Sequence, residues 1–413
     1  MKNEKITYKG FTPHIGQRKI INQILSSDSF FHIIKAGRQW GKSMMTQNLM
    51  LYYAINNPKY VVVWTAPSHS QAKHSMLNIY NAIKNSGIVV GYNKTERKIE
   101  LTNGSTLYFT GTDTEHYRGL SVDILICDEA AFFKPEVFSA LLPTLAVRGK
   151  KCIMISTPRG KNNNFYRYYA MGQDTTNQMY QSYSGILEDN PFRNIELIES
   201  ERQALPSFIF NQEYLAEFVD DGSTVFPNLN EAAQGNFQNP IANKKYAAGL
   251  DIGRQVDSTV LTILDEAGKV VFVYSDKQKS WDTITNNVIN HLRRYNSPKC
   301  VVEVNSIGDV VFEMLKKKGY NNLQPFTTGS NKQNLIENLI VAFENKEIII
   351  PSIKVFPDMY NELSAFTFEY SPRSRTIKYA APKGLHDDNV MSLAFAYECK
   401  NKYMKREGII IGY

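Results

Sequence analysis

The sequence predicts an α/β protein with two successive domains, each built on a sheet with helices around it. The first domain is indicated by a short apolar run at residues 30–34, a Gly-Lys-Ser turn at 41–43, and a good helix pattern from Met44 to Ala54. The second is indicated by three strand patterns after residue 245, then a helix, another strand and a late helix. Residues 220–243 lie between them, are rich in Asp, Gly, Asn, Pro and Gln, and lack periodicity, which predicts a linker.

The composition is that of a cytosolic protein with enough residues for two ordinary cores. The chain has 413 residues, 43% apolar content and a formal net charge of +7. This modest positive charge is compatible with a nucleic-acid partner. The 4 cysteines lie far apart, without the spacing of a metal site or of a disulfide framework. We expect neither membrane insertion nor secretion, because no apolar run has the length of a membrane span and the N-terminus lacks a signal-peptide core.

The Gly-Lys-Ser turn has the context of a phosphate-binding loop, because a buried strand leads into it and a helix leads out. Backbone N–H groups of such a loop converge at a helix N-terminus, where the dipole and the unpaired donors favour phosphate. We expect Lys42 to reach the β- and γ-phosphate oxygens of ATP and Ser43 to complete a Mg²⁺ shell. The predicted nucleotide-binding loop comprises Ala36, Gly37, Arg38, Gln39, Trp40, Gly41, Lys42 and Ser43, with Ala36 where the usual pattern has its first Gly.

A second buried strand ends in the adjacent acids Asp128 and Glu129, which is the arrangement of a Walker B motif. We expect Asp128 to hold Mg²⁺ through water, and Glu129 to orient and deprotonate the attacking water. The next strand ends in Ser156 and Thr157. Their hydroxyls either sense the γ-phosphate or simply cap the strand end.

Three further polar residues are candidates at the nucleotide site. Gln17, on an amphipathic helix before the loop, either reads the adenine edge or faces solvent. Arg38 is our candidate for a residue that acts on the phosphates in cis, and Arg118 for a finger that reaches a neighbouring subunit, or else a solvated surface residue. Together these patterns predict a P-loop ATPase domain (RecA-like, ASCE) over residues 1–219, with a small, mostly helical lid at 162–219.

Acidic residues recur within the second half of the chain. Asp251 lies on its first strand, Glu303 on its fourth, and Asp387 and Asp388 at the start of the late helix, which is the layout of RNase H-like nucleases. An acid in an apolar strand costs desolvation energy unless it is paired or bound to a metal. We therefore expect these side chains to bind two Mg²⁺ or Mn²⁺ ions for phosphodiester cleavage, in an RNase H-like α/β nuclease domain over 244–413.

Other interpretations of these acids stay open. Asp387 and Asp388 could also form a helix cap, and the sequence does not decide which of the two is the main ligand. Asp257 is either an auxiliary ligand or a turn residue. His386 either assists protonation or is an ordinary surface histidine.

At this point the sequence resembles a known family, the large terminase subunit of tailed bacteriophages. The resemblance rests on the loop 37–43, on 124–129, on Ser156-Thr157-Pro158, on 250–253, on Glu303 and on 385–388. It implies a motor that uses ATP and Mg²⁺ to thread double-stranded viral DNA into a procapsid, and a nuclease that cuts the concatemer. It also implies a portal protein and a small terminase subunit as partners. Other implications are a homo-oligomeric ring, with a monomer in isolation, and a place in the host cytoplasm and transiently on the portal vertex.

Two alternative functions come from other classes. The first is a helicase or remodelling ATPase whose RNase H-like half binds nucleic acid without cleaving it. The second is a structural virion protein with a vestigial nucleotide fold. The intact Lys42, Asp128 and Glu129 argue against the second, and the acids at 251, 303 and 388 argue against the first.

Overall fold

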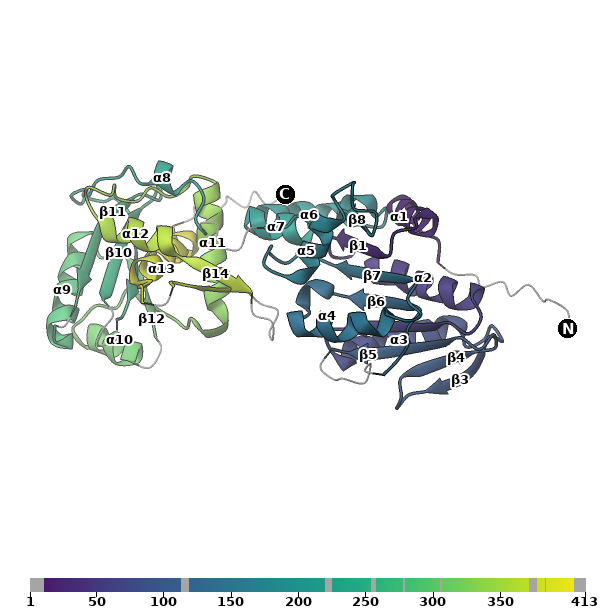
Figure 1. The fold of residues 1–413 in the computed structure, drawn as a ribbon. Coiled ribbons are helices and arrows are strands. Elements are labelled where there is room, and N and C mark those ends of the chain that lie inside the picture. Colours follow the sequence, from purple (N-terminus) through teal and green to yellow (C-terminus); the bar gives the residue numbers. More distant parts are fainter. Residues whose placement is uncertain are drawn as a thin grey trace, which may run out of the picture. The chain divides into compact units, whose positions relative to one another are not determined.

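The chain forms two compact units, whose elements can be followed in Figure 1. The computed structural model describes residues 11–112, 119–219, 225–253, 258–277, 279–304, 307–370, 377–382 and 384–404. The first unit takes the chain up to Ser200 and resumes at Phe208, whereas Glu201–Ser207 belong to the second unit together with the described chain from residue 225 onward.

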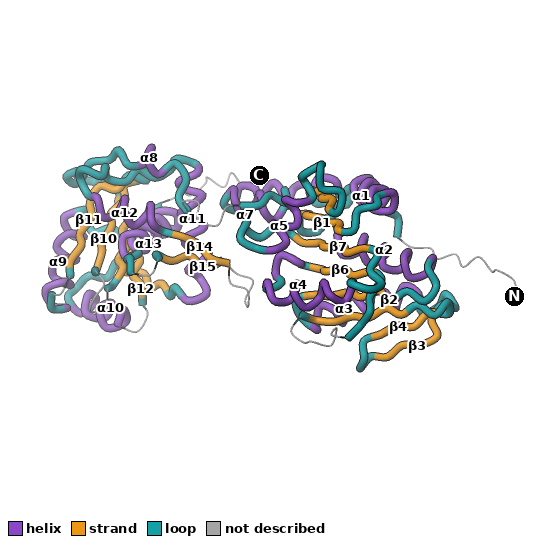
Figure 2. The backbone as a smooth tube through the Cα atoms, in the orientation of Figure 1, coloured by secondary structure: helices purple, strands orange, loops and turns teal. Residues whose placement is uncertain are grey.

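The first unit is built on a mixed sheet, whose strands are orange in Figure 2. Its central strands pair in parallel. In spatial order its strands are β3 (Val89–Asn93), β4 (Lys98–Leu101), β5 (Thr106–Gly111), β2 (Val61–Ala66), β6 (Ile124–Asp128), β7 (Lys151–Ser156), β1 (Phe31–Ala36) and β8 (Tyr180–Gly185). β4 and β5 form a hairpin around Asn103-Gly104, and β3 extends it as an antiparallel edge strand.

Helices cover both faces of this sheet. Those of the first unit are α1 (Ile15–Ser26), α2 (Lys42–Asn56), α3 (His69–Ile83), α4 (Pro135–Leu141), α5 (Asn164–Met171), α6 (Ile195–Ala204), whose last residues belong to the second unit, and α7, which starts at Ser207 and ends at Glu213. Apolar side chains of α1, α2 and α3 form one core with one face of the strands, and those of α4 and α5 form another core with the opposite face. Alternate strand residues therefore serve two cores, which explains the continuous apolar runs of β1, β2, β6 and β7.

The second unit is built on a smaller mixed sheet. In spatial order its strands are β11 (Val270–Asp276), β10 (Thr259–Asp265), β9 (Tyr246–Asp251), β12 (Lys299–Glu303) and β13 (Leu323–Phe326). β9, β10 and β11 form the predicted antiparallel meander, and β12 joins β9 in parallel. A separate hairpin consists of β14 (Thr367–Tyr370) and β15 (Ile377–Ala380).

The helices of the second unit are α8 (Leu229–Ala232), α9 (Trp281–Arg294), α10 (Ile307–Lys317), α11 (Lys332–Glu344), α12 (Pro357–Ala365) and α13 (Asp388–Tyr403). α9 and α10 form a core with one face of the sheet. α13 crosses the middle strand at Gly249, where a Cβ atom would lie 2.2 Å from the carbonyl oxygen of Ser392. This close approach fixes the start of α13 beside the end of β9. Across the described residues of both units, no helix is both long and apolar enough to cross a membrane.

The described part of 220–243, which the sequence predicts to be a linker, packs on the second unit. Phe226 is buried, with its ring 5.2 Å from that of Phe343 and 5.8 Å from that of Phe366. Leu229 and Ala232 of the short helix α8 are buried as well. The many turn-forming residues of this stretch suggest a linker, but its apolar residues Phe226, Leu229 and Ala232 are buried in the second unit.

The interpretation of 162–219 as a lid is wrong for its first part. β8 pairs in parallel with β1 along its whole length and is the edge strand of the main sheet. α5, which precedes it, contributes Phe165 to the core beneath that sheet. The polar side chains of β8 concealed this assignment, because an edge strand need not be apolar on both faces.

His32 of β1 makes the stability of the first unit depend on pH. Its ring is fully buried between Tyr183 Oη (2.8 Å) and Lys151 Nζ (3.2 Å), and burial, followed by the Lys151 charge, lowers the pKa of His32 to about 3. His32 therefore binds a proton near pH 6.5 in the unfolded chain but stays neutral at that pH in the folded chain. The free energy of unfolding consequently decreases as the pH falls below 6.5. We expect the loss of unfolding free energy between pH 7 and pH 5 to be about 2 kcal/mol smaller in His32→Gln than in the parent protein.

Urea denaturation in a Trp281→Phe background measures this difference, because the remaining tryptophans, Trp40 and Trp64, lie in the first unit. His74→Gln is the matched control, since His74 is exposed on α3. Equal pH dependence in the His32 and His74 variants would contradict the assignment.

Candidate nucleotide and metal sites

The candidate nucleotide site lies where parallel strands of the first sheet end. β7 pairs with β6, with Ile155 opposite Asp128, and with β1, with Ser156 opposite Lys35. Since the carboxyl ends of parallel strands meet at one edge, the phosphate loop, the two acids and the two hydroxyls arrive together. The register of these three strands places the predicted residues at one edge of the sheet.

Lys42 is the central cation of this cluster. It is buried, and its Nζ donates to Thr157 Oγ1 at 3.0 Å and lies 3.6 Å from Glu129 Oε1. Ser43 Oγ donates to Asp128 Oδ1 at 3.2 Å, and Ser156 Oγ donates to Glu129 Oε2, also at 3.2 Å. The hydroxyls of Ser156 and Thr157 therefore contact the charged groups of the site, and the strand-capping alternative does not describe them.

The groups around Asp128 shift its pKa in opposite directions. Burial, followed by the nearby Glu129 carboxylate, raises the pKa of Asp128 to about 7, while Lys42 and the Ser43 hydroxyl act in the opposite direction. A divalent cation next to this carboxylate would favour its ionised form further. Ser43 and Asp128 supply adjacent oxygen ligands, which are the donors that Mg²⁺ prefers, so this pair fits the predicted ion.

The phosphate loop has two glycines, and each is required for a different structural reason. Gly41 has φ +95°, a left-handed conformation that L side chains rarely adopt, and a Cβ on Gly37 would lie 2.4 Å from the carbonyl oxygen of Tyr214. Ala36 is buried at the end of β1 and causes no such conflict. The loop opens into a cavity of about 490 Å³, whose lining includes Gln17, Trp40, Lys42 and Ser43.

Gln17 does not face solvent. Only 3% of it is exposed, its Nε2 donates to the carbonyl oxygen of Gly41 at 3.0 Å, and its Oε1 accepts from the backbone of His14. It lines the same cavity as the phosphate loop, so the solvent-facing alternative is excluded.

One of the two predicted arginines, Arg38, lies among the described residues. Arg38 is mostly exposed, and its guanidinium pairs with Glu213 at the end of α7. Its backbone N–H also donates to the Glu213 carbonyl, at 2.7 Å. Arg118 lies outside the described residues, as does Asp257 of the second unit.

The candidate metal site of the second unit lies at the matching edge of the smaller sheet. β12 pairs in parallel with β9, with Val302 opposite Leu250, so Glu303 and Asp251 follow next to each other. Burial, followed by Glu303, Asp388 and Asp387, raises the pKa of Asp251 well above its ordinary range. The predicted acids thus act on one another electrostatically, and such a cluster of oxygen ligands fits a divalent cation.

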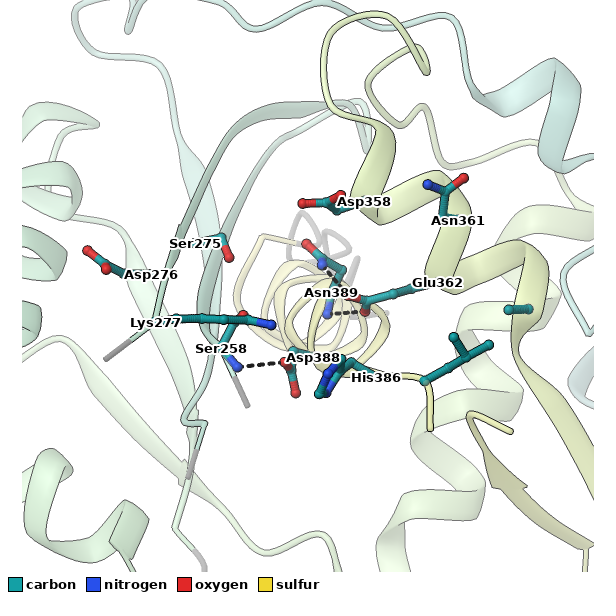
Figure 3. A pocket seen from close by; sticks show the side chains of 12 residues that line it. Ser258, Ser275, Asp276, Lys277, Asp358, Asn361, Glu362, His386, Asp388 and Asn389 are labelled. Atoms are coloured by element: carbon teal, nitrogen blue, oxygen red, sulfur yellow. Dashed lines mark hydrogen bonds between the residues drawn. The ribbon is translucent and has the colours of Figure 1, made fainter. Parts of the chain in front are cut away.

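A cavity of about 430 Å³ lies beside the start of α13. Figure 3 shows the side chains that line it. Asp388 Oδ2 accepts from the backbone N–H of Ser258 at 2.8 Å, and His386 lies beside it in the cavity wall. Glu362 accepts from the backbone N–H of Asn389 at 2.7 Å and from its Nδ2 at 2.6 Å. Burial, which outweighs these hydrogen bonds, raises the pKa of Glu362 to about 7.

Two residues of the second unit hold acids of the cluster in place. Thr328 Oγ1 donates to Glu303 Oε1 at 2.6 Å, and Lys332 Nζ lies 2.9 Å from Asp387 Oδ2. With the side chains so arranged, no three His, Cys, Asp or Glu side chains among the described residues are gathered closely enough to hold a metal ion. In this arrangement Lys332 pairs with Asp387, so a metal ion bound at Asp387 would compete with that contact.

Sequence reasoning missed several residues of both sites. In the first unit these are His14, Asp189 and Asn190, which contact the phosphate loop. In the second unit they are Thr328, Lys332, Glu362 and Asn389. None belongs to a local motif, so only the fold brings them to their partners. Asn389 adjoins the Asp387-Asp388 pair, and that position was the one signal available.

Two family models match the chain. The model described as terminase large subunit, T4likevirus-type, N-terminal, matches residues 33–233. The model described as terminase RNaseH-like domain matches residues 248–398. Between them they cover the phosphate loop, Asp128 and Glu129, and the acids of the second unit, whereas Gln17 precedes the first match.

Individual relatives agree with these matches. The terminase large subunit of Thermus virus P23-45 is 28% identical over 319 residues, which is 71% of this chain and 64% of the relative. That of Escherichia phage T5 is 30% identical over 270 residues, 62% of this chain and 61% of the relative. The match thus spans slightly less than two thirds of the length of these relatives. A solved structure of the large terminase from a thermophilic bacteriophage covers 94% of this chain and 99% of its own, with 14% identity and a TM-score of 0.49.

From the Lys332–Asp387 ion pair we predict that divalent metal affects the melting temperature of the second unit. In Lys332→Met the Asp387 carboxylate loses its cation and stays among like charges. Because this partly exposed pair is worth up to about 1 kcal/mol, we expect the melting temperature of the second unit in EDTA to fall by about 2–4 °C. We expect Mg²⁺ or Mn²⁺ to raise it again by more than in the parent protein.

Differential scanning calorimetry with and without metal measures both effects. Lys316→Met is the control, because the partner of Lys316, Glu313, lies on the exposed side of α10. The same metal response in both variants would exclude a cation requirement at Asp387.

Proposed function

Because the chain belongs to the terminase large subunit family, we propose that it is a DNA-packaging motor subunit of a tailed bacteriophage. Its first domain hydrolyses ATP to drive double-stranded viral DNA into a procapsid, and its second domain cuts the concatemeric DNA. The observation that carries the proposal is the convergence of Lys42, Ser43, Asp128 and Glu129 at one edge of the first sheet.

In the proposed ATP site, each charged group has a distinct task. The Lys42 ammonium exchanges its contacts with Thr157 and Glu129 for β- and γ-phosphate oxygens. Ser43 and Asp128 hold Mg²⁺, which when bound neutralises phosphate charge. Glu129, once released by Lys42, accepts a proton from the attacking water.

In this proposal Ser156 and Thr157 respond to the presence or loss of the γ-phosphate. Each hydroxyl touches a group that changes partner when the γ-phosphate leaves: Ser156 touches Glu129, and Thr157 touches Lys42. Gln17 contributes an amide at the cavity wall for the adenine edge. We further propose that Arg38 acts on the phosphates in cis and Arg118 in a neighbouring subunit.

In the proposed nuclease site, Asp251, Glu303, Asp387 and Asp388 hold divalent cations. Bound Mg²⁺ or Mn²⁺ supplies Lewis-acid stabilisation to the attacking and leaving oxygens of the phosphodiester. The raised pKa of Asp251 supports this role, because a carboxyl buried among like charges gains most from a cation. The backbone N–H of Ser258 donates to Asp388 Oδ2, which fixes one carboxylate at the start of α13.

The domain boundaries and the partners are part of the proposal. We assign the ATPase to 1–219, with the lid restricted to the chain after β8, and the nuclease to 244–413. The described part of 220–243 goes with the nuclease, because Phe226 packs in its core. The partners are double-stranded DNA, a portal protein, a small terminase subunit, and further copies in a ring, with a monomer in isolation. The place of action is the host cytoplasm and, transiently, the portal vertex of the procapsid. The helicase alternative has no observation in its favour.

Two substitutions separate the proposed activities. We expect Lys42→Ala to lower ATP turnover on the order of 100-fold or more, because the triphosphate loses its buried cation, while metal-dependent nicking of plasmid DNA persists. We expect Asp251→Asn to do the reverse. Phosphate release and Mn²⁺-dependent plasmid relaxation are measured for both variants in folded protein.

Lys73→Ala and Asp309→Asn serve as charge-matched controls, since both side chains are exposed in α3 and α10. If each of the two site variants abolished both activities, two independent sites would be excluded. If the parent protein failed to nick DNA with any divalent metal, the helicase alternative would replace the nuclease.

A further inference from the structure

Three successive carbonyl groups of the phosphate loop, those of residues 39–41, each accept a side-chain hydrogen bond. The donors come from two separate parts of the first unit. Asn190 Nδ2 lies 2.8 Å from the Gln39 oxygen, His14 Nε2 lies 2.9 Å from the Trp40 oxygen, and Gln17 Nε2 lies 3.0 Å from the Gly41 oxygen. The ring of His14 has a single tautomer that fits, because its Nδ1 accepts from the backbone N–H of Gln17.

These bonds control where the N–H groups of the loop point. In a planar peptide unit the C=O and the following N–H point in opposite directions. Fixing the carbonyls of Trp40 and Gly41 therefore fixes the N–H groups of Gly41 and Lys42. A phosphate loop binds its ligand through such N–H groups. Gln39 has φ +59°, which is uncommon for a side chain of its kind, and its carbonyl is the one that Asn190 holds.

The same turn that carries Asn190 also holds the ring of Trp40. Trp40 is fully buried, and its Nε1 donates to Asp189 Oδ2 at 3.0 Å. Asp189 Oδ2 accepts in addition from the backbone N–H of Ile186 at 3.2 Å. A Cβ on Gly185 would lie 2.4 Å from the Trp40 ring, so the indole packs directly on the backbone at the end of β8.

We propose that His14, Asp189 and Asn190 are positioning residues that hold the phosphate loop in its ligand-binding shape before nucleotide arrives. The proposal rests on the ATP site proposed above and adds a determinant of its affinity. The turn 185–190 and the start of α1 act as a brace around the loop. None of the three side chains needs to touch the reacting atoms.

The brace makes a specific kinetic prediction. Asn190→Asp keeps the shape and the Oδ1 acceptor for the backbone N–H of Phe192 (2.9 Å), but it replaces the donor to Gln39 by an oxygen. We expect the KM for ATP and the Kd for ADP–Mg²⁺ to rise about fivefold to tenfold, from one lost hydrogen bond plus repulsion. We expect kcat to change less than about twofold, because the loop binds substrate and transition state alike.

Two further variants test the brace from its other contacts. His14→Phe keeps an aromatic edge against the Trp40 ring, whose centroid lies 5.0 Å away, and loses the donor. Trp40→Phe keeps a buried ring and loses the N–H that donates a hydrogen bond to Asp189. We expect each to raise the KM about threefold to fivefold with the same small effect on kcat.

Asn194→Asp is the matched control, since Asn194 is exposed and caps α6 through an oxygen that Asp retains. Steady-state kinetics, calorimetric titration with ADP and nucleotide-free melting are measured for all four variants. A rise in KM and Kd with an unchanged nucleotide-free melting temperature supports the proposal. A melting temperature lowered without nucleotide, with KM unchanged, overturns it in favour of a purely structural role.

The failure of the proposed function has a different signature. If the parent protein neither hydrolyses ATP nor binds ADP, the ATP site itself is wrong. If the parent protein is active and sensitive to Lys42→Ala, but all three brace variants keep its KM and Kd, only the brace is wrong.

Discussion

The register of parallel strands is the constraint on which both candidate sites depend. In the first sheet, β1, β6 and β7 run side by side in the same direction, and this alone brings the phosphate loop, Asp128 and Ser156 to one edge. In the second sheet, β9 and β12 do the same for Asp251 and Glu303. A shift of either pairing by one residue would turn an acid from the site toward a core. The large apolar faces of these strands exclude that shift, so core packing and site geometry are set together.

The sequence predicted the parts of the fold that local chemistry specifies. The strand–loop–helix around Lys42, the acids after β6, and the meander followed by a helix and a strand carry local signals, and each is present. It failed where packing decides: the stretch that contains β8 reads as a lid, and Phe226 reads as part of a linker. Long-range polar contacts are hidden for the same reason. Asn190 and Gln39 are 151 residues apart, and no local pattern connects them.

The two candidate sites handle buried negative charge differently. Lys42 and Ser43 lie near the Asp128 carboxyl, and both favour its ionised form. The groups that act on Asp251 among the described residues are acids, and all of them raise its pKa. Lys332 compensates Asp387 from the rim of this cluster, where it is partly exposed. The first site thus has a lysine ammonium at its centre, whereas the charged groups around Asp251 that the structure describes are carboxyls, and these would gain from a bound cation.

The brace around the phosphate loop explains why this loop can contain few glycines. A Gly-rich loop adopts its tight shape through backbone freedom, which costs conformational entropy on ordering. Here Ala36, Gln39 and Trp40 occupy the loop, and Gly remains at 37 and 41, where a Cβ would meet the Tyr214 carbonyl and where φ is +95°. Trp40 restricts the loop by packing on Gly185, and side chains from α1 and the turn after β8 fix its carbonyls. Packing and hydrogen bonds from distant residues therefore take the place of local flexibility, and the shape of the loop becomes a property of the whole first unit.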